Sequence, residues 1–353
     1  MKKVVTILLA LVLALSLSVT AMAEGISYAL VTDVGNIDDQ SFNQGTWEGV
    51  KNFAAEKGLT ENVDYAYYKP SEDSDDARLE TIKAAIDAGA KVVVLPGYLF
   101  DAAVMTAAGQ YPDVNFLAVD LDPDSFPANV TNIKYTEEVS GYLAGYAVVK
   151  DGYTKLGFLG GINVPAVIRY GFGYIQGADA AAQELGVQVS VKYWYSGSFA
   201  PNDEIKAKMD SWYADGTEVV FACGGGILYS CIAAAEEGNG KIIGVDTDQG
   251  YISDRIITSA YKLIPVSVQA LLEKLDANQG KWPEDISGKN VKLGINEGAV
   301  GLPTAAASWR FAKFTVDEYN TVYEAIKAGT VTISDDITAN PTTSASVTVD
   351  YQN

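Results

Sequence analysis

The sequence contains no histidine, and only two of its 353 residues are cysteines. The absence of histidine excludes nucleophilic catalysis that depends on an imidazole base, proton transfer through imidazole, and metal ligation by histidine. The two cysteines, Cys223 and Cys231, are too few for a cysteine-rich zinc site. For this pair, a disulfide and two buried free thiols both remain open.

Basic residues are also scarce. Lys and Arg total 25 against 45 Asp and Glu, which gives a formal net charge of -20. A chain this acidic repels phosphate backbones and lacks a basic face for anionic lipid, so nucleic acid and membrane surfaces are poor partners. The 48% hydrophobic and 20% charged residues are typical of a globular protein. The length suits two domains of about 150 residues each.

The first residues have the features of an export signal. Two lysines precede an apolar stretch over 4–19, and the segment 21–23 has the small residues that signal peptidase recognises. The sequence therefore predicts a signal peptide over 1–23, cleaved before Glu24. The product would be extracytoplasmic: periplasmic, secreted or associated with the cell surface. A cysteine for lipid attachment is absent from the cleavage point, and later stretches are too short or too polar to cross a bilayer.

Strand-like and helix-like segments alternate along the rest of the chain. The apolar run 26–32 ends at a polar residue, and 41–57 then has helical periodicity with Ser41 as its predicted cap. Such alternation is typical of parallel sheets covered by helices on both faces. The alternating residues 331–333 predict a further strand in the C-terminal tail.

The second half of the chain repeats the first. Three short segments recur in the same order and at nearly the same offset: 47–49 at 175–177, 93–97 at 220–224, and 118–120 at 244–246. This repetition predicts two similar α/β lobes. Ligands of such sheets bind beyond the carboxyl ends of the strands, so two facing lobes would share one cleft.

The densest group of polar residues follows the first predicted strand. It is the segment 33–44, Asp-Val-Gly-Asn-Ile-Asp-Asp-Gln-Ser-Phe-Asn-Gln, in which Asp33 ends the strand. Helix starts present free N–H groups to polar ligand atoms, and Phe42 is a large ring in a polar turn, which favours a binding role. In the alternative interpretation, the polar residues before Phe42 only cap the helix and its ring packs locally.

Three more candidates stand at strand ends. Asp120 and Asp246 end matching strands of the two halves, where their carboxylates can accept hydrogen bonds from vicinal sugar hydroxyls. Lys262 ends another predicted strand, so its ammonium would face the same cleft. The alternatives are turn formation by the aspartates and an ordinary surface position for the lysine.

Two turns of the second half complete the candidates. Gly224, Gly225 and Gly226 connect a strand to a helix and allow a ligand to approach the backbone closely, but they lack the spacing of a dinucleotide or phosphate loop. Phe199 is a second large ring in a turn, with Trp194 as its competitor. Two calcium-loop patterns are incomplete, so neither a metal nor a cofactor is predicted.

The segment 33–44 strongly resembles the D-x-G-x-x-D-D-x-S-F-N-Q signature of the basic membrane protein family. The members of this family are nucleoside-binding receptors of ABC transporters. Further matches follow in order between about 26 and 330, at 141–145, 157–161, 197–199, 244–246 and 258–259.

The resemblance implies an α/β protein with a type I periplasmic-binding-protein fold, in which two similar Rossmann-like lobes with parallel sheets are joined by a hinge. The first lobe would comprise 24–135 and about 262–302, and the second 136–261 and about 303–353. The implied function is to bind a nucleoside, with a purine base favoured, and to deliver it to a permease without catalysis. The permease would be the chain's only link to the membrane.

The resemblance also implies roles for eight residues. Two rings from opposite lobes would sandwich the base, a carboxylate would bond its edge, and a group of charged residues would hold the ribose. By this resemblance the two rings are Phe42 and Phe199, and the carboxylate at the base is Asp33. The ribose would be held by Asp120, Asp246 and Lys262. Asn43 and the backbone at Gly225 would make further contacts. Family members are usually lipoproteins, from which this chain differs by lacking the cysteine.

Two alternatives remain. Riboflavin or a sugar would suit the same fold, because an aromatic ring and vicinal hydroxyls occur in ribityl flavins as well as in nucleosides. A nucleoside hydrolase fits less well, since its calcium-binding D-x-D-P-G-x-D-D motif has Val31 here in place of the first aspartate and Val34 in place of the proline.

Overall fold

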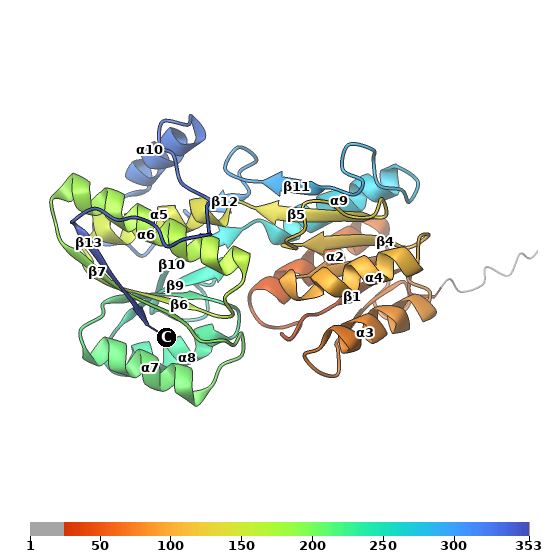
Figure 1. Ribbon diagram of the computed structural model, residues 1–353, viewed down its shortest axis with the longest axis horizontal. Coiled ribbons are helices and arrows are strands. Elements are labelled where there is room, and N and C mark those ends of the chain that lie inside the picture. Colours follow the sequence, from red (N-terminus) through yellow and green to blue (C-terminus); the bar gives the residue numbers. More distant parts are fainter. Residues whose placement is uncertain (1–24, 353) are drawn as a thin grey trace, which may run out of the picture.

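The computed structural model describes residues 25–352, which form two α/β units side by side (Figure 1). The predicted signal peptide and its cleavage site lie outside the described residues. The unit at the right of the view contains a six-stranded sheet and the unit at the left a seven-stranded sheet. We call them the first and the second lobe. Within 25–352, no helix has the length and apolar character needed to span a membrane.

The sheet of the first lobe is parallel throughout, in the order β11-β5-β4-β3-β1-β2. Alternate residues of its strands face opposite layers of helices, as the two-residue repeat of a strand requires. Val92 and Val94 belong to the core beneath α2 (Phe42–Lys57) and α9 (Ile264–Ala277). Val93 and Leu95 belong to the core beneath α3 (Asp75–Asp87) and α4 (Asp101–Gln110). The strands are β1 (Tyr28–Val31), β2 (Tyr65–Tyr68), β3 (Val92–Pro96), β4 (Asn115–Val119), β5 (Val130–Tyr135) and β11 (Asn290–Leu293).

The sheet of the second lobe has the order β12-β10-β9-β8-β6-β7-β13, and only its β10–β12 pair is antiparallel. Both sheets place their first five strands in the same order, 5-4-3-1-2, so the predicted repeat is a repeat of topology. The strands are β6 (Lys155–Gly160), β7 (Val189–Tyr195), β8 (Val219–Cys223), β9 (Lys241–Asp246), β10 (Ile256–Lys262), β12 (Val300–Gly301) and β13 (Val347–Gln352).

Helices cover both faces of each sheet. In the first lobe α2 packs with α9 and α3 with α4, and in the second lobe α5 packs with α6 and α7 with α8. A short 3-10 helix, η1 (Tyr98–Phe100), precedes α4. The helices are α2 (Phe42–Lys57), α3 (Asp75–Asp87), α4 (Asp101–Gln110), α5 (Glu137–Asp151), α6 (Pro165–Leu185), α7 (Asp203–Ala214), α8 (Ile227–Gly238), α9 (Ile264–Ala277) and α10 (Val316–Lys327).

The prediction of a strand at 331–333 is wrong. Residues 330 and 331 instead close the end of α10, because their N–H groups both donate to the carbonyl of Ala325. The strand of the tail is β13, which adds to the sheet parallel to β7.

Helices α5 and α6 approach each other unusually closely. Gly141 and Gly145 of α5 face α6, and Gly173 and Gly177 of α6 face α5. A Cβ atom at Gly145 would lie 2.0 Å from the carbonyl oxygen of Tyr174, and one at Gly177 would lie 1.9 Å from that of Tyr142. The two helix backbones are therefore in direct contact, which only glycine permits. The motif at 141–145 has a packing role in this structure.

Three segments carry the described chain from one sheet to the other. They lie between β5 and α5 at Thr136, between β10 and α9 at Leu263, and between β11 and β12 at 294–299. Backbone hydrogen bonds join them, from Thr136 N to Leu293 O at 3.1 Å and from Leu263 N to Ala299 O at 2.9 Å. The exact boundaries of the two lobes remain a prediction from the sequence.

Candidate functional site

A cavity of about 680 Å³ lies between the lobes, at the carboxyl ends of both sheets. The first lobe lines it at and after the ends of β1, β2, β3 and β4, and the second lobe at and after the ends of β6, β7, β8, β9 and β10. All eight residues predicted from the sequence line this cavity: Asp33, Phe42, Asn43, Asp120, Phe199, Gly225, Asp246 and Lys262. Their contact with a ligand stays a prediction.

Phe42 begins helix α2 at the cavity, but the cap of this helix differs from the prediction. Ser41 occupies the N-cap position without a capping bond from its side chain. The carboxylate of Asp39 instead accepts hydrogen bonds from the backbone N–H groups of Ser41, Asn43 and Gln44 at 2.9–3.0 Å. The hydroxyl of Ser41 is free for another partner because Asp39 caps the helix.

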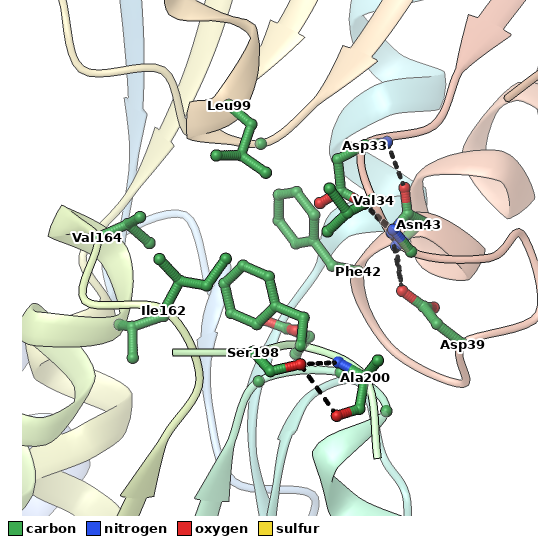
Figure 2. A pocket seen from close by; sticks show the side chains of 18 of the residues that line it. Asp33, Val34, Asp39, Phe42, Asn43, Leu99, Ile162, Val164, Ser198 and Ala200 are labelled. Carbon is green, nitrogen blue, oxygen red and sulfur yellow. Dashed lines mark hydrogen bonds between the residues drawn. The ribbon is translucent and has the colours of Figure 1, made fainter. Parts of the chain in front are cut away.

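Asp33 and Asn43 form a polar wall on one side of the Phe42 ring (Figure 2). Oδ1 of Asp33 accepts from Nδ2 of Asn43 at 2.9 Å and from the N–H of Gly35 at 2.6 Å. A Cβ atom at Gly35 would lie 2.4 Å from Nδ2 of Asn43, so glycine is required for this contact. Burial raises the pKa of Asp33 to about 6, although these hydrogen bonds act in the opposite direction.

Apolar side chains lie on the other side of that ring. Leu99 of the first lobe and Ile162 and Val164 of the second line the cavity there (Figure 2). None of these three residues was predicted from the sequence. Leu99 and Ile162 follow β3 and β6 closely, so the rule that located the aspartates at strand ends was sufficient to find them.

Phe199 is the ring that the second lobe contributes to the cavity. It lies against two glycines, since a Cβ atom at Gly161 would be 2.3 Å from its Cδ1 and one at Gly224 would be 3.0 Å away. Gly225, the next residue along this loop, has a φ of 54° and also lines the cavity. Trp194, the competing aromatic, is 8% exposed and packs in the core beside α7 and α8.

Lys262 is the centre of a buried charged cluster. Its Nζ lies 2.6 Å from Oδ2 of Asp120, 3.4 Å from Oδ1 of Asp246 and 3.5 Å from Oε1 of Glu137. The residue is only 3% exposed, so the surface alternative for this lysine is wrong. Burial opposes its charge, but the three carboxylates outweigh burial and raise the pKa of Lys262. The ammonium also lies 4.8 Å from the centroid of the Phe42 ring.

Asp120 and Asp246 occupy equivalent places in the two lobes and share an unusual backbone conformation. Their φ angles are 61° and 64°, in the left-handed region that aspartate tolerates better than most residues. Burial raises the pKa of Asp120 to about 7, against the attraction of Lys262. Oδ1 of Asp120 is buried and has no hydrogen-bond partner among the described residues. It is an acceptor available to a ligand.

The lobes also touch directly beside the cavity. The hydroxyl of Ser41 donates to Oδ2 of Asp246 at 2.6 Å. The carbonyl of Gln40 accepts from Oγ1 of Thr247 at 3.1 Å and from Nε2 of Gln249 at 2.9 Å. The start of α2 in the first lobe is thereby bonded to the segment after β9 in the second.

Cys223 and Cys231 are both buried free thiols, so the disulfide alternative is not realised. Burial raises the pKa of Cys231 to about 12, so this group stays a protonated thiol at neutral pH and is a poor nucleophile. Within residues 25–352, the structure contains no group of three or more acidic or cysteine side chains arranged to hold a metal ion.

Known proteins resemble this chain over most of its length. The family model of the PnrA-like ABC transporter substrate-binding proteins, Bmp, matches residues 26–340. The "ABC transporter nucleoside-binding protein BmpA" of Lactococcus lactis subsp. cremoris is 29% identical over 293 residues, covering 78% of this chain and 80% of that protein. "Basic membrane protein A" of Borreliella burgdorferi is 32% identical over 280 residues, covering 78% of each chain.

A solved structure agrees in fold. ABC transporter solute-binding proteins from Aeropyrum pernix K1 superpose with a TM-score of 0.71 at 21% identity, covering 87% of each chain. This likeness confirms the predicted type I periplasmic-binding-protein fold. The two sheets, with their covering helices, and the cavity between them are the two lobes and the cleft of that fold.

Proposed function

The chain belongs to the Bmp family of PnrA-like ABC transporter substrate-binding proteins, and from this premise we propose that it binds a nucleoside between its lobes and delivers it to a permease. Proteins of this class act outside the cytoplasm on small molecules. Membership of the family gives a substrate-binding protein, and the identity of the substrate as a nucleoside is our proposal. A purine nucleoside is the favoured ligand. The signal peptide over 1–23, cleaved before Glu24, belongs to the same proposal.

One observation carries the proposal. A single cavity combines an aromatic ring from each lobe with a buried cluster of two aspartates and a lysine. Rings stack on a nucleobase whatever its hydrogen-bonding edge, and such stacking contributes about 1–3 kcal/mol per base. Carboxylates and ammonium groups form directional, charge-assisted hydrogen bonds with hydroxyl groups. A nucleoside has both parts, a flat base and a sugar with vicinal hydroxyls.

The first lobe supplies groups suited to the edge of the base. Asp33 accepts two hydrogen bonds through Oδ1 and has a pKa raised to about 6, so near neutral pH it is an acceptor and in mild acid it becomes a donor. Asn43 is held beside it, with its side chain bonded to both Asp33 and Asp39. We assign to this pair the contacts that orient the base between Phe42 and Phe199.

The charged cluster suits the ribose. Oδ1 of Asp120 lacks a partner among the described residues, and a buried acceptor of this kind is satisfied when a ligand hydroxyl donates to it. Lys262 can donate to the same hydroxyls. A free base would leave these groups unsatisfied, so the cluster should discriminate strongly against it.

The name of the Lactococcus lactis relative supports the proposal, since that protein is described as nucleoside-binding. In our proposal the ligand is bound without chemical change, the lobes close around it, and the permease recognises the closed form. Riboflavin and sugars remain the competing ligands of the same cavity.

The test is a binding screen with the chain from Glu24. Inosine, guanosine, adenosine and uridine would be compared with hypoxanthine, ribose, riboflavin and galactose by thermal shift, followed by calorimetry of each ligand that binds. A nucleoside at 100 times its Kd should stabilise the protein by about 2.7 kcal/mol. Shifts with nucleosides but not with hypoxanthine or ribose are expected. Shifts with riboflavin or galactose alone would replace the nucleoside by that ligand.

A further inference from the structure

Glu137 is buried completely beside the proposed ribose site, yet it is not among the residues that line the cavity. It is the first residue of α5, where acidic residues commonly lie exposed and interact with the free N–H groups of the helix. Here its carboxylate points instead to two cations. A fully buried carboxylate is costly unless it is paired, so its presence requires an explanation.

Glu137 connects the charged cluster of the cavity to a second cation. Its Oε2 accepts a hydrogen bond from Nε of Arg169 at 2.6 Å, and its Oε1 lies 3.5 Å from Nζ of Lys262. Arg169 belongs to α6, and its side chain is 14% exposed. Attraction from Arg169 and Lys262 lowers the pKa of Glu137 in spite of its burial. The carboxylate is therefore ionised and attracts Lys262, although it does not itself line the cavity.

Backbone contacts fix the start of α5, which carries Glu137, beside the end of β10, which carries Lys262. Glu137 directly follows the crossing segment at Thr136, and Lys262 directly precedes the one at Leu263. One turn into α5, Ser140 donates to the carbonyl of Tyr261 at 2.9 Å and accepts from the N–H of Gly301 at 2.8 Å. The start of α5 is thus bonded to the end of β10, so the backbone segments that carry Glu137 and Lys262 are held next to each other.

Arg169 is equally well placed. It lies one turn before Gly173, where a Cβ atom would be 2.0 Å from the carbonyl oxygen of Glu138. The backbones of α5 and α6 are in contact at this point, next to Glu137. The ion pair between Glu137 and Arg169 therefore joins two elements that cannot shift relative to each other without a clash.

We propose that Glu137 and Arg169 form a positioning pair that holds Lys262 for the recognition of vicinal hydroxyls without touching the ligand. Lys262 is paired with Asp120 and Asp246, which line the cavity, and with Glu137, which does not. The ammonium already donates to Oδ2 of Asp120, and without the attraction of Glu137 it would shift further toward Oδ1 of Asp246 and occupy acceptor sites that the hydroxyls need. The inference rests on the proposed function, because it assigns the pair to the ribose part of the ligand.

The experiment compares two ligands that differ only in these hydroxyls, inosine and 2′,3′-dideoxyinosine. Their affinities would be measured by calorimetry for the wild-type chain from Glu24 and for Glu137→Gln, with thermal unfolding as the check of folding. The variant should bind inosine about tenfold more weakly and dideoxyinosine within twofold of the wild type. A purely structural role for Glu137 would weaken both ligands by the same factor.

The matched control is Glu184→Gln. Glu184 also joins α6 to α5, through the hydroxyl of Tyr146 at 2.8 Å and Nζ of Lys150 at 3.3 Å, but it does not line the cavity. Its variant should bind both ligands as the wild type does. Arg169 provides a second test: Arg169→Met should reproduce the selective loss and Arg169→Lys, which keeps the charge, should restore most of it. The Arg169 variants decide the question if Glu137→Gln does not fold.

Two outcomes overturn the inference. One is unchanged inosine affinity in Glu137→Gln and Arg169→Met, and the other is an equal loss for inosine and dideoxyinosine. If the wild-type chain binds no nucleoside at all, the proposed function fails and the inference fails with it. Inosine binding by the wild type, unchanged in the variants, refutes the positioning pair alone.

Discussion

The hydroxyl of Ser41 donates a hydrogen bond to Oδ2 of Asp246 across 2.6 Å, and thereby joins the start of α2 in the first lobe to the end of β9 in the second. Both residues are buried. Two further bonds reach the carbonyl of Gln40 from Thr247 and Gln249 in the second lobe. The conformation in which the lobes meet around the cavity is thus stabilised by the protein itself.

Replacing Ser41 by alanine should weaken this closed conformation. A hydrogen bond to a charged group contributes about 1.5–3 kcal/mol, so ligand affinity should fall by about tenfold or more. Small-angle X-ray scattering should show a larger radius of gyration for the ligand-free variant and an unchanged value for the ligand-bound one. Ser230→Ala is the control, because Ser230 bonds only within its lobe, to Asn202. Unchanged scattering and affinity in Ser41→Ala would contradict this role.

Phe42→Ala should weaken all nucleosides similarly. Stacking does not depend on the hydrogen-bonding edge of a base, and its loss costs about 1–3 kcal/mol. Calorimetry with inosine, adenosine and uridine would measure the effect, with Tyr67→Ala as the control, since Tyr67 is 45% exposed and lies outside the cavity. A loss confined to one base would instead indicate that Phe42 shapes a specific edge contact.

Lys262→Met should destabilise the protein in a pH-dependent manner. Removal of one partner from a buried ion cluster costs about 3–5 kcal/mol, because it leaves the carboxylates unpaired. The pKa of Asp120 is already raised to about 7, and loss of Lys262 raises it further. A carboxyl with a raised pKa in the folded state loses stability as the pH rises through that pKa. The deficit should therefore be larger at pH 8 than at pH 5.5.

Urea denaturation at the two pH values would measure this difference. Lys192→Met is the matched control, since Lys192 pairs with Asp215 at 2.9 Å where the side chains are 23% and 71% exposed. An exposed pair of this kind contributes about 0–1 kcal/mol, so its variant should change little. An equal loss for Lys262→Met at both pH values would show that the effect is one of packing.

Asp33→Asn should stabilise the ligand-free protein and weaken its binding of ligand. Burial raises the pKa of Asp33 from 3.8 to about 6, so the wild type loses stability as the pH rises through this range. Asparagine carries no charge and avoids that loss, which amounts to about 1–3 kcal/mol at pH 7.5 and vanishes near pH 4. Urea denaturation at both pH values and inosine calorimetry would measure the two effects. The control is the exposed Asp113→Asn.

The sequence predicts the site well where a simple rule applies. In parallel sheets the carboxyl ends of the strands lie at one edge, so polar residues at strand ends come together although they are far apart in the chain. Asp33, Asp120, Asp246 and Lys262 were found in this way, and all of them line the cavity. The repeat in the sequence likewise predicts the shared strand order of the two sheets.

Prediction failed where the choice between local alternatives depends on distant residues. Both Asp39 and Ser41 can cap α2, and only the presence of Asp246 beside Ser41 decides which of them does. Glu137 has the same appearance in the sequence as any acidic residue in a first helical turn. Its burial depends on Arg169 and Lys262, which no local pattern connects to it.

The contact between α5 and α6 gives the last prediction. Gly145→Ala would place a Cβ atom 2.0 Å from the carbonyl oxygen of Tyr174, so the helices would have to separate. Overpacking of this kind costs about 1–3 kcal/mol, and backbone atoms cannot yield as a flexible side chain does. Glu137 and Ser140 lie on the same helix as Gly145. The contact of Glu137 with Lys262 and the hydrogen bond from Ser140 to β10 should therefore loosen too.

The control uses a glycine with free space around it. No heavy atom lies within 4 Å of a Cβ atom built at Gly109 in α4. Gly109→Ala should therefore stabilise the protein by up to about 1 kcal/mol, since alanine is the better helix former. Urea denaturation of both variants should show opposite signs. Equal behaviour of the two would mean that α5 and α6 can move apart freely, and then neither Glu137 nor Arg169 would be held firmly enough to position Lys262.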